Sequence, residues 1–207
     1  MIFGLILFSF GLIFVIRANL GAAPWDVLHT GIAGTTGMSI GTASIAIGIV
    51  ILIIIKLWDH KLGLGTIANI LLIGIFIDVI LKADFIPKMN NIAGALTMLV
   101  AGCFAISTGS YFYIKSAFGA GPRDSLMVLL AQKTKFPVGI CRGTIELFVT
   151  ITGWLLGGMV GFGTVIYVIG ISFCIQITFR LFKFDVTVVK HESLGDTLAA
   201  LTGNSGR

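Results

Sequence analysis

Four long runs of the sequence contain no Asp, Glu, Lys or Arg, and they constrain the fold more than any other feature. These runs cover residues 1–16, 39–55, 89–114 and 147–179. A helix needs roughly 20 mostly apolar residues to cross about 30 Å of hydrocarbon at about 1.5 Å per residue. With 57% hydrophobic and 11% charged residues, the chain is too apolar for a soluble domain. The sequence therefore predicts an all-α membrane protein.

The last of these runs is too long for one crossing. A glycine-rich segment at residues 157–163 marks the place where the chain is expected to leave the bilayer and re-enter it. This interpretation gives about six transmembrane helices. They are predicted near residues 2–17, 38–56, 64–82, 93–114, 138–156 and 163–181.

A short motif occurs twice, as GAAPWD at residues 21–26 and as GAGPRD at residues 119–124, 98 positions later. The same offset relates Gly4 and Gly102, Gly11 and Gly109, Gly41 and Gly139, Gly63 and Gly161, Gly65 and Gly163, and Thr66 and Thr164. Shared apolarity does not explain a gapless register of such residues, so the sequence predicts two copies of one unit. Each copy has three spans, an odd number. The second copy is therefore expected to cross the membrane with opposite polarity, as in inverted-repeat transporters.

The repeat and the charges predict how the chain is organised. The first membrane repeat is assigned to residues 1–92, the second to 93–183, and a cytoplasmic tail with a short helix around 193–202 to 184–207. If the N-terminus is cytoplasmic, most Lys and Arg residues lie on the inner side, as the positive-inside rule requires. Both termini are therefore predicted to face the cytoplasm. On this topology Trp25 suits the outer interface and Arg123 the cytoplasmic side.

Each motif is expected to begin a short helix. Pro24 suits the first helical position, and Asp26 falls in the first turn, where the helix dipole favours an anion. The helix is predicted to end near Gly34 or Gly37, and about a dozen residues cannot span a bilayer. It is either interfacial or re-entrant. Asp26 and Asp124 either cap their helices or offer carboxylates to a solute near the midplane.

Charged residues within predicted spans are costly there and usually face a bundle interior. Asp78 is the preferred site for solute binding and for proton or cation coupling, with snorkelling to water at a span end as the alternative. Arg142 and Glu146 lie four residues apart on one helix face, so they either pair with each other or bind solute. Asn69, whose counterpart is Tyr167, adds a polar group. The candidate solute-binding residues are Asp26, Asn69, Asp78, Arg123, Asp124, Arg142, Glu146 and Gln176.

Other function classes have no support in the sequence. No catalytic constellation, phosphate-binding loop or cluster of metal ligands is found, so neither an enzyme nor a cofactor is expected. His29, His60 and His191 are far apart and predicted to lie in loops or near span ends. The net charge of +5 comes from basic residues at span ends, without interleaved aromatics, and does not predict nucleic-acid binding. The three cysteines are expected to be packing residues.

Several motifs together resemble the YczE/YyaS/YitT family of bacterial integral membrane proteins. They lie at residues 17–26, 36–41, 63–66, 74–78 and 119–124. Ala23 departs from the pattern, since the second copy has Gly121 there. The resemblance implies a protein of the bacterial cytoplasmic membrane and carries no agreed biochemical activity.

Two function hypotheses follow. The first is transport of a small polar or ionic solute across the cytoplasmic membrane, because a symmetric scaffold with an asymmetric polar interior suits one asymmetric solute. The second is a non-transporting membrane scaffold, or a regulatory partner of another protein. The sequence leaves the solute, the coupling ion, the direction of transport and a homo-oligomeric state open.

Overall fold

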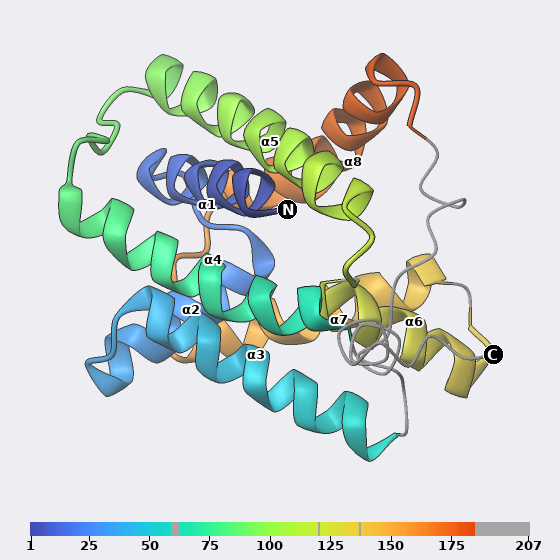
Figure 1. The fold of residues 1–207 in the computed structure, drawn as a ribbon. Coiled ribbons are helices and arrows are strands. Elements are labelled where there is room, and N and C mark those ends of the chain that lie inside the picture. The colour runs from blue at the N-terminus through green and yellow to red at the C-terminus, as the bar shows by residue number, and fades with distance from the viewer. Residues whose placement is uncertain (59–62, 120, 137, 185–207) are drawn as a thin grey trace, which may run out of the picture.

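The computed structural model describes residues 1–58, 63–119, 121–136 and 138–184, without the side chains of residues 124, 138 and 139. Within these ranges the chain is helical and has no strand (Figure 1). The helices are α1 (Ile2–Arg17), α2 (Pro24–Thr36), α3 (Ile40–Leu57), α4 (Leu64–Ala83), α5 (Ile92–Lys115), α6 (Pro122–Thr134), α7 (Val138–Leu155) and α8 (Phe162–Leu181). The helix predicted around 193–202 lies outside the described residues.

Four helices are long and apolar enough to cross a membrane, namely α3, α4, α5 and α8. The predicted class, an all-helical membrane protein, is therefore confirmed. The six predicted spans coincide with α1, α3, α4, α5, α7 and α8, and their ends agree to within two residues. Two of these six helices are not among the four that are long and apolar enough to cross a membrane. α1 is apolar but has 16 residues, and α7 contains Arg142 and Glu146.

The helix boundaries repeat along the chain with the offset of the sequence motifs. α2 and α6, α3 and α7, and α4 and α8 begin and end 98 residues apart in each pair. Backbone conformation follows the same rule just before the short helices. Asn19 and Ala117 both have φ of 59°, and Gly21 and Gly119 have φ of 117° and 139°. Glycine suits the last two positions because it has no Cβ to clash at positive φ.

The apolar core divides the helices into two groups. The larger cluster draws its buried side chains mainly from α1, α4, α5 and α8, with Leu12, Ile77, Leu99 and Ile171 as examples. A smaller cluster joins α2, α3, α6 and α7 through Trp25, Leu28, Ile55, Leu129 and Val149. Figure 1 shows α1 beside α5 in the first group, and α2, α3, α6 and α7 on the other side of α4. Each group contains equivalent helices from both halves of the chain.

Two glycines on α1 and two on α5 bring these helices into backbone contact. A Cβ added at Gly4 would lie 2.8 Å from the carbonyl oxygen of Gly109, and one added at Gly11 would lie 2.8 Å from that of Gly102. The contacts are reciprocal, because Gly102 is the counterpart of Gly4 and Gly109 that of Gly11. Such reciprocity is typical of elements related by a two-fold axis.

The loops before the short helices make a second reciprocal contact. The backbone N–H of Gly163, at the start of α8, donates to the carbonyl of Leu20 at 2.7 Å. The N–H of Gly65, at the start of α4, donates to the carbonyl of Phe118 at 2.8 Å. Each half therefore places the start of its short helix against the first turn of the other half's last helix.

The short helices begin and end as the sequence predicts. Pro24 and Pro122 each occupy the first helical turn, and both helices have 13 residues. α2 ends at Gly37, whose φ of 75° forms a left-handed cap. At 1.5 Å per residue, such a helix is roughly 20 Å long, which is too short to cross a bilayer.

Close contact between α1 and α5 predicts an unequal response to the same substitution at two glycines. Gly11→Ala should destabilise the fold by about 1–3 kcal/mol, because the new Cβ would lie 2.7 Å from the backbone nitrogen of Ile106. Gly34→Ala is the matched control, since nothing lies within 4 Å of its Cβ position. Thermal unfolding of the detergent-solubilised variants checks this. Equal unfolding midpoints for the two variants would contradict it.

Candidate functional site

The first turns of α2 carry a buried polar pair. Asp26 has 0% and His29 has 1% of its surface exposed, and His29 Nδ1 lies 3.2 Å from Asp26 Oδ1. The other carboxylate oxygen, Oδ2, is buried and has no hydrogen-bond partner in the described part of the chain. A buried polar atom without a partner carries a desolvation cost of about 1–3 kcal/mol, more if it is charged. Asp26 therefore has a buried acceptor that none of the described residues uses.

Burial also determines the state of the histidine. Desolvation lowers the pKa of His29, and the hydrogen bond to Asp26 opposes this effect without outweighing it. The imidazole is thus neutral near pH 7. If Asp26 is ionised, Nδ1 must carry the imidazole proton and donate it to the carboxylate.

A side-chain contact joins the first turns of the two short helices. The guanidinium carbon of Arg123, on α6, lies 5.0 Å from the ring centroid of Trp25, on α2, in cation–π geometry. Trp25 is buried. The sequence interpretation that separated these two side chains onto opposite interfaces is therefore wrong. The two residues that differ between the motifs are contact partners instead.

Three polar side chains of α2 and α6 lie near this contact. Asp26 is the neighbour of Trp25 in the sequence, and Trp25 is the residue that Arg123 contacts. We call Asp26, His29 and Arg123 the central polar cluster. The cluster contains a carboxylate, a guanidinium and an imidazole, so it offers partners to either sign of charge. Of the offset pair on α4 and α8, Asn69 is buried, and Tyr167 is partly buried and packs against the larger apolar cluster.

Asp78 lies elsewhere, at the junction between α4 and the start of α3. Its Oδ1 accepts a hydrogen bond from the backbone N–H of Gly41 at 2.9 Å, and its Oδ2 accepts one from the Ser39 hydroxyl. Ser39 is itself the N-cap of α3. The carboxylate thus satisfies donors at a helix N-terminus, where a negative charge is favoured.

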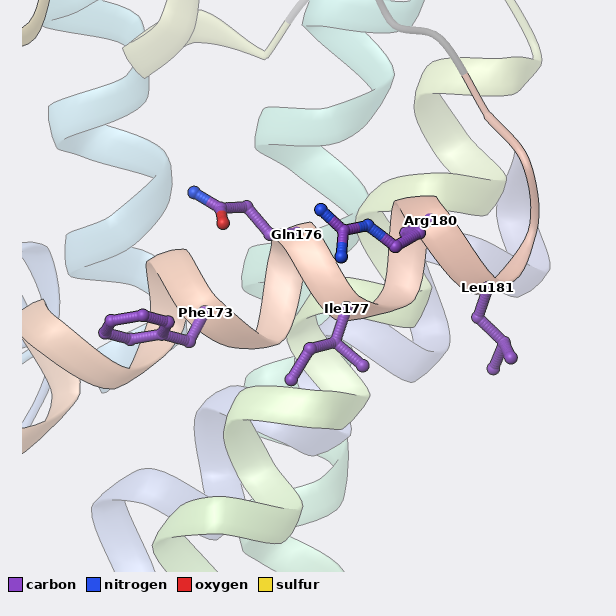
Figure 2. A pocket seen from close by; sticks show the side chains of 5 residues that line it. All are labelled: Phe173, Gln176, Ile177, Arg180 and Leu181. Atoms are coloured by element: carbon purple, nitrogen blue, oxygen red, sulfur yellow. The ribbon is translucent and has the colours of Figure 1, made fainter.

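The remaining predicted residues lie on α7 and α8. Arg142 Nε donates to Glu146 Oε1 at 2.8 Å, so the expected pair forms. Gln176 and Arg180 line a hollow of about 590 Å³ on α8, together with Phe173, Ile177 and Leu181. Figure 2 shows Gln176 and Arg180 extending from one side of α8 and Ile177 from the other.

The described residues change one further expectation about a side chain. His29 was expected in a loop or near a span end, but it is buried within α2. The signal that could have found it is its spacing of three from Asp26, which puts both on one helix face. No group of three metal-ligating side chains is found among the described residues. The side chain of Asp124, together with His60 and His191, lies outside the described part. The three cysteines are free and buried, as predicted.

Comparison with known sequences places these features in a family. The model of a family of unknown function, DUF6198, matches residues 1–180. The uncharacterized membrane protein YczE of Bacillus subtilis is 36% identical over 166 residues, which cover 79% of this chain and 76% of that protein. An uncharacterized protein of Haemophilus influenzae is 32% identical over 176 residues, covering 85% and 80%.

More distant similarity supports the same assignment. The uncharacterized protein YyaS of Bacillus subtilis is 25% identical over 171 residues, covering 80% of this chain and 83% of that protein. No solved structure matches the chain. The resemblance to YczE and YyaS that the motifs predicted is thus confirmed, and the chain belongs to the DUF6198 family of membrane proteins of unknown function.

Proposed function

We propose that this protein transports a small polar or ionic solute across the bacterial cytoplasmic membrane. One observation carries the proposal. The buried Oδ2 of Asp26 has no hydrogen-bond partner among the described residues, and Asp26 adjoins the residue that contacts Arg123. A structural carboxylate is expected to have its oxygens hydrogen-bonded. A carboxylate that serves a solute needs an oxygen that is free when the solute is absent.

The short helices support this role. Helices that do not cross the bilayer but begin inside a protein leave backbone N–H groups without partners in their first turn. In secondary transporters such broken helices meet near the midplane at the interface of two repeats and bind the solute there. The contact of Trp25 with Arg123, which links the first turns of α2 and α6, supports a shared site between the two short helices.

Inverted topology is the second part of the proposal. α1, α3 and α4 would cross the membrane in the first half, and α5, α7 and α8 would cross in the second. Two observations support a two-fold axis in the membrane plane. Three pairs of helices begin and end 98 residues apart, and the glycine contacts between α1 and α5 are reciprocal. The charge distribution favours cytoplasmic termini.

The central polar cluster restricts the solute. Asp26 Oδ2 needs a hydrogen-bond donor or a cation, whereas the Arg123 guanidinium, which has only donors, needs an acceptor. A solute that carries both kinds of group, such as a zwitterion or a hydroxy acid, would satisfy both at once. The neutral imidazole of His29, through its hydrogen bond to Oδ1, holds the Asp26 carboxylate in its orientation.

Asp26→Asn should fold and lose solute binding, because the amide keeps the shape of the side chain but not its charge. Thermal unfolding of the purified protein is measured against a panel of amino acids, hydroxy acids and inorganic ions. A solute at about 100 times its Kd stabilises the folded state by about 2.7 kcal/mol. That stabilisation should vanish in Asp26→Asn.

Asp84→Asn is the matched control, because Asp84 is exposed and pairs with Arg17. It should keep the response to the solute. Equal stabilisation of Asp26→Asn and the unchanged protein would remove Asp26 from the site. If no compound stabilises the protein and reconstituted vesicles take none up, the non-transporting scaffold becomes the better hypothesis.

The inverted topology predicts that the ends of the short helices face opposite sides of the membrane. Gly34 on α2 and Gln132 on α6 are counterparts at the offset, and both are exposed. In a variant without the three native cysteines, Gly34→Cys should react with an impermeant maleimide from outside the cell. Gln132→Cys should react from the cytoplasmic side. Reaction of both from one side would contradict the inverted arrangement.

A further inference from the structure

The two halves of the chain differ in one packing contact. α3 packs along α4, with Gly41 against Gly74 and Gly48 against Ile70. A Cβ added at Gly41 would lie 2.0 Å from the carbonyl oxygen of Gly74, so the two backbones touch. The equivalent helices of the second half, α7 and α8, do not pack along each other within the described residues. The chain thus holds one pair of equivalent helices together and the other apart.

Hydrogen bonds follow the same difference. Asp78 joins α4 to the start of α3 through the Ser39 hydroxyl and the Gly41 N–H, and we call these two bonds the clasp. The counterpart of Asp78 on α8 is Gln176. Gln176 is exposed, lines the hollow of about 590 Å³, and makes no hydrogen bond to α7 in the described part of the chain.

The face of α7 that corresponds to the packed face of α3 is polar. Ser44 and Gly48 of α3 are buried, and Gly48 contacts Ile70 of α4. Their counterparts on α7 are Arg142 and Glu146. Since the two helices have equal bounds, this ion pair lies on the side of α7 that would face α8 in a closed arrangement. On α8 the corresponding polar residues are Gln176 and Arg180, and the hollow that they line is bounded by residues of α8.

We call the separation between α7 and α8 the gap. Both helices carry polar side chains, and such groups are tolerated in a membrane only where water or protein covers them. The proposed topology places the start of α7 and the end of α8 on the cytoplasmic side. The clasp between the start of α3 and the end of α4 lies on the opposite side.

We infer that the clasp is the closed outer gate of this transporter and that the gap between α7 and α8 is its open inner gate. The inference rests on the proposed transport function and adds the path by which a polar solute reaches the central polar cluster from the cytoplasm. In the opposite state the clasp opens, α3 leaves α4, and α7 packs on α8. Gly143 and Ser172, the counterparts of Ile45 and Gly74, are small enough for that approach.

The second half has space for this movement. A Cβ at Gly143 would meet nothing within 4 Å, whereas one at Gly74 would lie 2.4 Å from the Ile45 side chain. Ser172 is exposed, and Gly74 is buried. The same positions are thus in contact in one half and separated in the other, which is the relation expected of two gates that close alternately around one site.

Thiol accessibility tests the inference without any solute. Ser44→Cys and Ser172→Cys are conservative changes, one in the closed α3–α4 contact and one beside the open gap. Each is placed in a variant without the three native cysteines, and permeabilised membranes are treated with a charged methanethiosulfonate reagent. Ser172→Cys should react rapidly, whereas Ser44→Cys should be protected. A thiol that faces lipid stays protonated and reacts poorly, so an unreactive Ser172→Cys would overturn the open inner gate.

Weakening the clasp should move the protection from one gate to the other. Adding Asp78→Asn or Ser39→Ala should raise the reaction rate of Ser44→Cys about tenfold or more, the factor that losing a hydrogen bond to a charged group can produce. The rate of Ser172→Cys should fall in the same variants. Thr35→Ala is the control, because the Thr35 hydroxyl bonds only to carbonyls of its own helix.

Two further outcomes are decisive. Unchanged thiol reaction rates in both clasp variants would overturn the inference, because the clasp would then have no effect on the equilibrium between the two gate states. If Asp78→Asn fails to assemble, Ser39→Ala still decides the question, since it removes one bond and leaves the carboxylate in place. Loss of the gate would leave the solute test on Asp26 unaffected, and loss of solute binding in that test would leave these rates unaffected. The two failures are therefore distinguishable.

Discussion

Backbone contact between α1 and α5 is the constraint on which the rest of the structure depends. In a bilayer, apolar side chains gain little by leaving lipid, so helices associate through close packing and small residues at their interface. Gly4, Gly11, Gly102 and Gly109 supply that packing between α1 and α5. Because each glycine contacts the counterpart of the other, the contact fixes both the distance and the relative orientation of the two halves.

Much of the fold was predictable because its signals are local. Apolar runs give helix positions, and the positions of Gly, Pro and Asp at a constant offset give the repeat without any knowledge of contacts. Pro24 and Gly37 mark the ends of α2 by their backbone requirements alone. It was not predictable that α3 packs along α4 whereas α7 does not pack along α8 within the described residues. Equivalent sequences give equivalent helices, but whether two helices touch depends on the conformation of the whole bundle.

The candidate site was only partly predictable, for the same physical reason. Asp26 was singled out by the repeated motif, and the pair Arg142 and Glu146 because charged groups are costly in a span. His29 was missed because a histidine in a short helix carries no such cost by itself. The contact of Trp25 with Arg123 joins two side chains that are 98 positions apart in the sequence, so no local signal predicts it. Asp78 was recognised as unusual, but its partners on α3 are set by tertiary packing.

The backbone hydrogen bonds between the loop of one half and the last helix of the other bear on how the protein is synthesised. Leu20 leaves the ribosome long before Gly163, yet the Leu20 carbonyl accepts its hydrogen bond from the backbone N–H of Gly163. Until the last helix is inserted, the first half holds an unsatisfied backbone group in a setting without free water. Neither half is then a complete folding unit, and a chain truncated before α8 would expose this defect to the quality-control proteases of the membrane.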